Sequence, residues 1–156
     1  MPKISSGIVM YRLKAGQPQV LLVHPGGPFW RNKDDGAWSI PKGEGTDGED
    51  LLEAAKREFE EEIGQKPTGD FIPLNPVKQK SGKIVYAWAV EGDIDTSGIK
   101  SNTFTMEWPP KSGKQAQFAE IDRAEFFDLA TAAKKINPAQ ADLLSQLGRL
   151  LADRIR

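Results

Sequence analysis

The sequence contains no cysteine. That absence excludes disulfides and thiolate metal sites, and it fits the reducing cytoplasm that we expect as the compartment. Long apolar runs are also missing, so we expect neither a membrane-spanning helix nor, in the polar stretch from Met1 to Ser6, a signal peptide. Internal repeats and low-complexity linkers are absent too. With 156 residues, 38% of them hydrophobic and 28% charged, the chain suits one globular domain over residues 1–156.

The net charge is small, −1 at neutral pH, but it is unevenly distributed. Residues 44–62 hold nine acidic and two basic side chains, a local charge of −7, which leaves about +6 on the remainder. An acidic cluster in a mildly basic surround suits a cation site beside an anionic substrate, and equally a solvated acidic helix face. The spacing of the acidic residues has to decide between these two interpretations.

The apolar pattern predicts a mixed α/β domain in which helices cover a sheet. Strands are expected at 8–11, 20–23, 38–40 and 83–90, more weakly at 103–108 and 117–121, and as an edge or irregular segment at 71–77. A first helix is expected to begin near Gly48 or Glu49, because Thr46 and Glu49 form a capping box, and to end at Gly64. Two further helices are expected at 125–136 and 138–155.

Glu58, Glu61 and Glu62 share one face of the first helix, because positions i, i+3 and i+4 are neighbours on a helix surface. Like charges this close destabilise a helix by about 0.2–0.5 kcal/mol per pair. A hard divalent cation would remove that cost by taking the carboxylate oxygens as ligands. Glu60 lies on another side of the helix and is not counted with this cluster.

The same segment resembles the box of the Nudix family, G-x5-E-x7-R-E-U-x-E-E-x-G-U, where U is a bulky apolar residue. The matching positions, all at the required spacings, are Gly43, Glu49, Arg57, Glu58, Phe59, Glu61, Glu62 and Gly64. The last position departs from the box, because Gln65 stands where an apolar residue is expected. The flanking order of strands and loops is also similar to that family. The resemblance implies a Nudix-like α/β/α sandwich with a mixed β-sheet and a loop-helix-loop box.

The resemblance further implies a pyrophosphohydrolase that binds Mg²⁺ or Mn²⁺ and cleaves a nucleoside diphosphate linked to another group. By position, the implied metal ligands are Glu58, Glu61, Glu62 and the carbonyl of Gly43. These glutamates are also the implied catalytic residues, because carboxylates can face a polyanionic pyrophosphate only through metal. Bound ions would lower the pKa of a water and stabilise charge on the leaving phosphate. Glu49 and Arg57 look like a structural ion pair that orients the helix.

A catalytic base outside the box is expected on a loop or late strand, as in many members of the family. Glu120 is the preferred candidate and Glu107 the second. A solvated or salt-bridged carboxylate is the non-catalytic interpretation of either residue. His24, the only histidine, ends a strand and is interpreted as a structural residue rather than as the base.

Three side chains are candidates for binding substrate. Lys42 resembles the basic residue of a Pro-Lys-Gly segment that is found in some members of the family that act on polyphosphates. The alternative is a solvated lysine. Trp30 lies in a glycine- and proline-rich loop that either shapes a pocket or packs on the surface. Tyr86, like Trp88, either stacks on a base or packs in the core, and the core interpretation is favoured.

Residues 38–43 and 83–88 look most like the dinucleoside polyphosphate and NTP branch, so the expected partner is a small nucleotide and not a membrane. The alternative substrates are ADP-ribose, a diphosphoinositol polyphosphate and an RNA 5′ end. A non-catalytic Nudix-fold nucleotide-binding or regulatory module is the alternative from another class, and the complete set of box carboxylates disfavours it. The pattern G-x-G-x-x-G at 43–48 also matches a dinucleotide-binding loop, but Glu49 and Asp50 would repel a pyrophosphate there.

Overall fold

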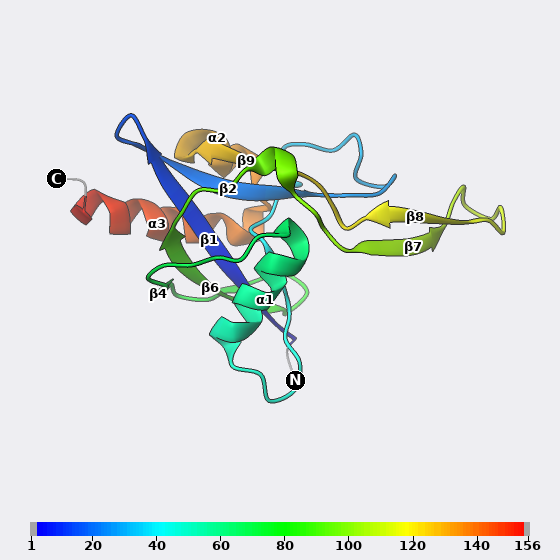
Figure 1. Cartoon of the computed structure of the whole chain (residues 1–156), viewed down its shortest axis with the longest axis horizontal. Helices are drawn as coiled ribbons and strands as arrows, with labels where there is room; N and C mark the ends of the chain where they lie inside the picture. Colours follow the sequence, from blue (N-terminus) through cyan, green and yellow to red (C-terminus); the bar gives the residue numbers. More distant parts are fainter. Residues whose placement is uncertain (1–2, 155–156) are drawn as a thin grey trace.

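The computed structural model describes residues 3–154 and has a mixed β-sheet between two layers of helices (Figure 1). The strands of the sheet are β1 (Ile4–Lys14), β2 (Gln17–Pro25), β3 (Lys42–Glu44), β4 (Ile72–Pro73), β5 (Val77–Lys78), β6 (Ile84–Glu91) and β9 (Ile121–Asp128). A separate hairpin consists of β7 (Thr103–Glu107) and β8 (Gln115–Ala119). The helices are α1 (Leu51–Ile63), α2 (Leu129–Lys135) and α3 (Ala141–Arg154), with 3₁₀ turns η1 (Thr96–Gly98) and η2 (Pro138–Gln140). No helix within residues 3–154 is long and apolar enough to cross a membrane.

Strand β1 is central to the sheet. It runs parallel to β6 over nearly its whole length, from Ile4 opposite Ile84 to Tyr11 opposite Glu91. Its first residues also pair with β3, and its last residues pair with β2, which continues along β9. Because β3 occupies the place beside the start of β1, its short backbone is held in the sheet directly next to α1.

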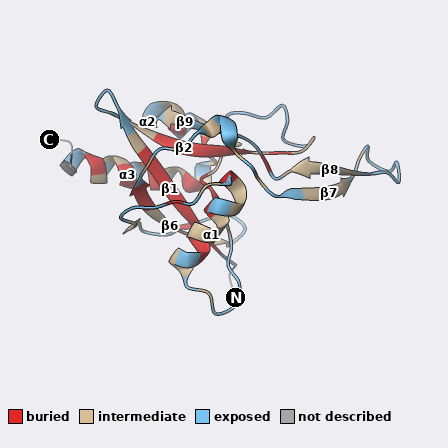
Figure 2. Ribbon diagram, viewed as in Figure 1, coloured by how far each residue is buried: buried red, intermediate tan, exposed pale blue. Residues whose placement is uncertain are grey.

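Both faces of the sheet are buried, and Figure 2 shows the central strands as red between helices with exposed outer sides. Val9 and Tyr11 point to a core shared with α2 and α3, whereas Ile8 and Met10 point to a core shared with α1. The two sets alternate because successive strand residues face opposite sides of a sheet. The predicted α/β/α sandwich with a mixed sheet is confirmed.

Helix α1 begins later than the capping box predicts. Asp50 is the N-cap, and its carboxylate accepts a hydrogen bond from the backbone N–H of Glu53 at 3.2 Å. Glu49 instead turns back to accept from the N–H of Thr46 at 3.0 Å, so this bond closes a turn before the helix. The predicted C-terminal cap is confirmed, because Gly64 is left-handed with φ 83°.

The segment 125–136, predicted as helix, is a strand as far as Asp128. Its backbone pairs antiparallel with β2, and α2 begins only at Leu129. The helix-favouring alanines and lysines of the segment lie within α2, whereas the two phenylalanines before them suit the strand that pairs with β2. The last predicted helix is confirmed as η2 from Pro138 followed by α3, and its expected end at Ile155 lies outside the described residues.

Most of the shorter strands are found where they were predicted. The weak candidates at 103–108 and 117–121 form the hairpin, and the proline-containing segment 71–77 supplies the very short edge strands β4 and β5. The predicted strand 38–40 is wrong as a continuous strand. It makes only isolated bridges, from Ser39 to Val23 and from Trp38 to Ile136.

Candidate active site

The acidic face of α1 lies against the backbone of β3. The N–H of Lys42 donates a hydrogen bond to Glu62 Oε2 at 2.8 Å. A Cβ on Gly43 would collide with the carboxylate of Glu58, so the strand can approach this side chain only because a glycine stands there. Two of the three predicted metal ligands on the helix are therefore packed directly onto the residues that precede it.

Arg57 ties α1 to the loop before it. Its Nε and Nη2 donate to the two oxygens of Glu49 at 2.9 and 3.0 Å, a bidentate pair that lowers the pKa of Glu49 to about 2. Its Nη1 donates to Glu58 at 3.0 Å and to both oxygens of Glu61 at 3.1 Å. The expected pairing of Glu49 with Arg57 is present, and the same guanidinium also holds two of the helix carboxylates.

Burial disfavours the charged form of two of the helix carboxylates, Glu58 and Glu62. Burial raises the pKa of Glu62 to about 8, although the N–H of Lys42 opposes this shift. Burial also raises the pKa of Glu58, and the negative charge of Glu120 adds to the shift of both groups. The pKa of Lys42 is lowered, first by burial and then by the charge of Lys83. Buried acidic groups of this kind mark a place where a cation would be favourable.

Glu120 reaches this cluster from the junction of β8 and β9. Its N–H donates to the carbonyl of Asn102 at 2.9 Å, and its carbonyl accepts from the N–H of Gly26 at 2.8 Å. The N–H of Asn102 donates in turn to the carbonyl of Glu61 in α1 at 3.2 Å. The backbone of Glu120 is thus fixed where α1, the hairpin and the loop after β2 meet.

The other two titratable candidates lie elsewhere. His24 is fully buried, with Nδ1 at 2.8 Å from Asp122 Oδ1 and Nε2 at 2.6 Å from the carbonyl of Lys33. Both ring nitrogens are therefore used to hold the loop after β2, which is a structural role. Glu107 ends β7 at the far tip of the hairpin, where its carboxylate accepts from the N–H of Lys111 at 2.8 Å. Of the two predicted bases, Glu120 is the one whose charge acts on Glu58 and Glu62.

The family model of the NUDIX domain matches residues 1–147, nearly the whole chain. The chain belongs to the Nudix family. Nudix hydrolases generally use divalent metal ions. The predicted resemblance to this family is confirmed, as is the predicted class of enzyme, a pyrophosphohydrolase.

Solved structures of other Nudix proteins share the fold. An Ap4A hydrolase of C. elegans in a binary complex is 24% identical, with a TM-score of 0.67 over 97% of this chain and 98% of that one. The NUDIX domain of Shewanella oneidensis NrtR complexed with ADP ribose is 17% identical, with a TM-score of 0.66 over 97% and 89%. The ORF135 protein of E. coli is 19% identical, with a TM-score of 0.59 over 98% and 94%. No curated protein matches the sequence.

The carboxylate oxygens of this Nudix box are suitable ligands for a hard divalent cation, but the described side chains do not form a complete coordination shell. Within residues 3–154, no three Asp, Glu, His or Cys side chains form a cluster that could hold a metal ion. Arg57 donates to both oxygens of Glu61 and to one oxygen of Glu58. Yet every donor is a carboxylate oxygen, the ligand that Mg²⁺ prefers. Glu62, moreover, accepts a hydrogen bond from the described residues through Oε2 alone.

The predicted substrate-binding residues of the Nudix hydrolase lie in three different places. Lys42 is half-buried beside the helix carboxylates. Trp30 shares a cleft with Glu120. Tyr86 is half-buried on the α1 side of β6, as is Trp88, which packs against the core that α1 covers. The interpretation of Trp88 as a core residue is therefore confirmed.

Sequence reasoning missed three residues around the site. Lys3 lines a basic groove beside β3, and Phe104 and Met106 line the cleft that contains Trp30. The alternation in the weak strand at 103–108 places Phe104 and Met106 on one face, which is a usable signal. That signal does not indicate which loop the face would meet.

Proposed function

We propose that this Nudix hydrolase cleaves a phosphoanhydride bond in a nucleotide with several phosphates, either a dinucleoside polyphosphate or an NTP. The observation that carries the proposal is the packing of α1 against β3, where the N–H of Lys42 binds the buried carboxylate of Glu62 and the glycine at position 43 leaves room for that of Glu58. Carboxylates gathered in this way can act on a polyanion only with a cation between them. The name of the C. elegans protein of similar fold, an Ap4A hydrolase, supports a dinucleoside polyphosphate.

The ligands that we propose for Mg²⁺ or Mn²⁺ are Glu58, Glu61, Glu62 and the carbonyl of Gly43. Such an ion supplies a lowered pKa for a bound water and charge stabilisation for the phosphoryl oxygens. The chain's own contribution is to position the oxygens. The N–H of Lys42 fixes one carboxylate, Arg57 holds two others, and Glu49 holds Arg57 in turn.

In the proposed reaction Glu120 is the general base. It accepts a proton from a water molecule while the water oxygen attacks phosphorus and the bond from phosphorus to the leaving phosphate oxygen breaks. Support comes from its fixed backbone and from its electrostatic effect on Glu58 and Glu62. A base on a separate segment can hold the water on the side opposite to the helix carboxylates.

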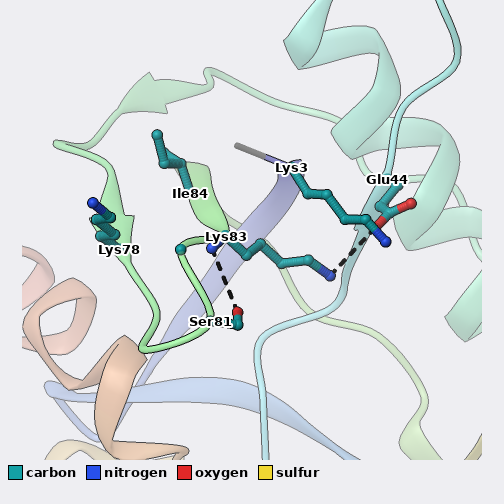
Figure 3. Close-up of a pocket in the computed structure, with 7 residues that line it drawn as sticks. Lys3, Glu44, Lys78, Ser81, Lys83 and Ile84 are labelled. Carbon is teal, nitrogen blue, oxygen red and sulfur yellow. Dashed lines mark hydrogen bonds and ion pairs between the residues drawn. The ribbon is translucent and has the colours of Figure 1, made fainter. Parts of the chain in front are cut away.

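A basic groove beside β3 supports a substrate with several phosphates. Its volume is about 610 Å³, and Figure 3 shows Lys3 and Lys83 reaching toward Glu44, with Lys78 on the other side of the opening. The ammonium of Lys83 lies 3.5 Å from the carboxylate of Glu44, an exposed pair that an incoming phosphate can replace at little cost. The charge of Lys83 also lowers the pKa of Lys42, whose backbone N–H binds Glu62 of α1.

The test is a panel of nucleotides assayed with and without Mg²⁺. NTPs, dinucleoside polyphosphates, ADP-ribose and RNA with a 5′ triphosphate are compared by product release. We expect Mg²⁺-dependent cleavage of an NTP or a dinucleoside polyphosphate by the wild type. The variant Glu62→Gln should lose about 100-fold or more in kcat, because a neutral amide is a poor ligand for a hard cation.

The matched control is Glu60→Gln, which removes an exposed carboxylate from the same helix turn and should keep full activity. Circular dichroism checks that both variants are folded. Absence of cleavage for every nucleotide with Mg²⁺ or Mn²⁺ would overturn the proposal in favour of a binding module. Cleavage of ADP-ribose or RNA alone would overturn the substrate class and leave the hydrolase in place.

A further inference from the structure

Glu120 also lines a second cavity, a cleft of about 370 Å³ between the loop after β2 and the β7–β8 hairpin. Figure 1 shows the hairpin projecting from the body of the molecule on the side to which this loop extends. The side chains that form the walls of the cleft are those of Pro28, Phe29, Trp30, Phe104 and Met106. The walls are thus apolar and mainly aromatic, while the one carboxylate belongs to the proposed base.

Two aromatic rings of the cleft, those of Phe29 and Trp30, are exposed to solvent instead of packing in the core. Phe29 is 65% exposed and Trp30 37%, and within residues 3–154 only Ile4 and Leu13 are other large hydrophobic residues with such exposure. The two rings meet edge to face at 5.4 Å. Exposed apolar side chains gathered at one place mark a binding surface.

A cation completes this surface. The ammonium of Lys33 lies 4.0 Å from the ring centroid of Phe29 and 5.0 Å from that of Trp30. It therefore brings positive charge to the edge of an aromatic wall. A ligand for this place combines a flat apolar group with a negative charge.

The two walls are held together by direct backbone contact. The N–H of Gly26 donates to the carbonyl of Glu120 at 2.8 Å, and a Cβ on Gly26 would collide with the carbonyl of Ala119. A Cβ on Gly27 would lie only 2.8 Å from the ring of Phe104. Two adjacent glycines thus let the loop lie directly on the hairpin. The cleft is preformed, so a ligand does not have to order it.

We propose that this cleft binds the planar base of the nucleotide whose phosphates react at the helix carboxylates. The inference rests on the proposed function, because Glu120 belongs to both places. Aromatic side chains stack on any base, and a cavity at the small end of the usual range suits one base rather than a whole nucleotide. The phosphates then leave the cleft past Lys33 and Glu120 and reach the carboxylates of α1.

The direct test measures binding without metal and without a cleavable bond. AMP carries the base and one phosphate, whereas ribose 5-phosphate lacks the base. We expect AMP to bind at least about tenfold more tightly and to quench tryptophan fluorescence, with Trp30→Ala losing the quench. Phe104→Ala should weaken the binding of AMP about tenfold and leave the affinity for ribose 5-phosphate unchanged.

Thr105→Ala is the matched control, because this exposed neighbour on β7 points to the opposite face of the hairpin and should change neither affinity. Met106→Ala is the second variant should Phe104→Ala unfold. Equal affinities for AMP and ribose 5-phosphate would overturn the base site. So would a loss in Phe104→Ala that is the same for both ligands.

Hydrolysis separates this inference from the function on which it rests. With Mg²⁺, Phe104→Ala should raise the KM for ATP about tenfold with little change in kcat, and should leave the cleavage of inorganic tripolyphosphate unchanged. AMP binding with the expected pattern but no cleavage of any anhydride would overturn the hydrolase and support the base site. Cleavage with equal effects on ATP and tripolyphosphate would overturn the base site alone.

Discussion

Glu120 is the residue at which the proposed chemistry and the proposed base site meet, so its replacement separates catalysis from binding. Glu120→Gln keeps the size of the side chain and the backbone bonds to Asn102 and Gly26 but removes the proton acceptor. We expect kcat to fall about 10²–10⁴-fold, the usual contribution of a general base, with little change in KM. Mn²⁺ affinity, followed by electron paramagnetic resonance, should remain near that of the wild type.

Glu107→Gln serves as its control, because this carboxylate lies at the far tip of the hairpin and contacts Lys111. It should retain wild-type kcat. If Glu120→Gln instead bound Mn²⁺ weakly and regained activity at high Mn²⁺, the residue would be a metal ligand rather than the base. A kcat within about twofold of the wild type would exclude both roles.

The candidate site could be predicted from the sequence only where its residues are close together along the chain. The spacing of Glu58, Glu61 and Glu62 is a local pattern, and it indicates a shared helix face without any knowledge of distant contacts. Phe104 gives no such local signal with Trp30, because the two are brought together by backbone contacts between a loop and a hairpin. Arg57 shows a limit even within a local pattern. Helix spacing puts Glu53, Glu61 and Glu49 within its reach, but it does not indicate that one guanidinium binds Glu49, Glu58 and Glu61 together.

At the scale of elements, the link between α1 and the loop before it should depend on pH through Glu49. Arg57 lowers the pKa of this carboxyl from 4.5 to about 2 in the folded chain. An acid whose pKa is lowered by folding contributes stability above its unfolded pKa, and that contribution is lost as pH falls toward the folded pKa. The difference in Tm between the wild type and Glu49→Gln should therefore be largest near pH 7 and shrink between pH 5 and pH 2.

Thermal unfolding followed by circular dichroism measures this difference. Glu53→Gln is the control, because its carboxylate meets Lys56 at 3.3 Å on the exposed side of the same helix. An exposed pair contributes little, so its Tm should stay near that of the wild type at every pH. If the difference in Tm between the wild type and Glu49→Gln were the same at pH 7 and pH 3, the ion pair between Glu49 and Arg57 would not be the source of the stability.

The elements also show where a sequence pattern ceases to determine structure. In the segment 125–136 the alanines and lysines that favour a helix lie at 130–135, within α2, whereas residues 125–128 include two phenylalanines and pair with β2 as a strand. Strand propensity depends on such partners, which no local window contains. Helix α1 was predictable to within a turn because its apolar stripe and its glycine cap are both local.

At the scale of the whole molecule, the candidate active site lies on the α1 side of a sheet whose other face is closed by α2 and α3. Helix α1 contributes the carboxylates, and the backbone of β3 packs against them. The loop after β2 contacts the hairpin through the hydrogen bond from the N–H of Gly26 to the carbonyl of Glu120. The loops and the hairpin can change their side chains while the sandwich keeps the carboxylates in place. That division is consistent with one family model covering the chain although the three structural relatives named above are only 17–24% identical to it.

A divalent cation should stabilise the whole fold, because it would offset the cost of burying the charged carboxylates of Glu58 and Glu62. The ion has to compete with Arg57 for Glu58 and Glu61, so the gain follows mass action rather than appearing at trace concentrations. At about 100 times the Kd, binding adds roughly 2.7 kcal/mol to the free energy of unfolding, or about 5–10 °C to the Tm of a chain of this size.

Calorimetry with Mg²⁺ or Mn²⁺ measures this rise in Tm. The ionic strength is matched with NaCl, and EDTA should reverse the effect. Glu62→Gln should lose most of it and Glu60→Gln should keep it. Equal rises in both variants would mean that the cation binds elsewhere on the chain.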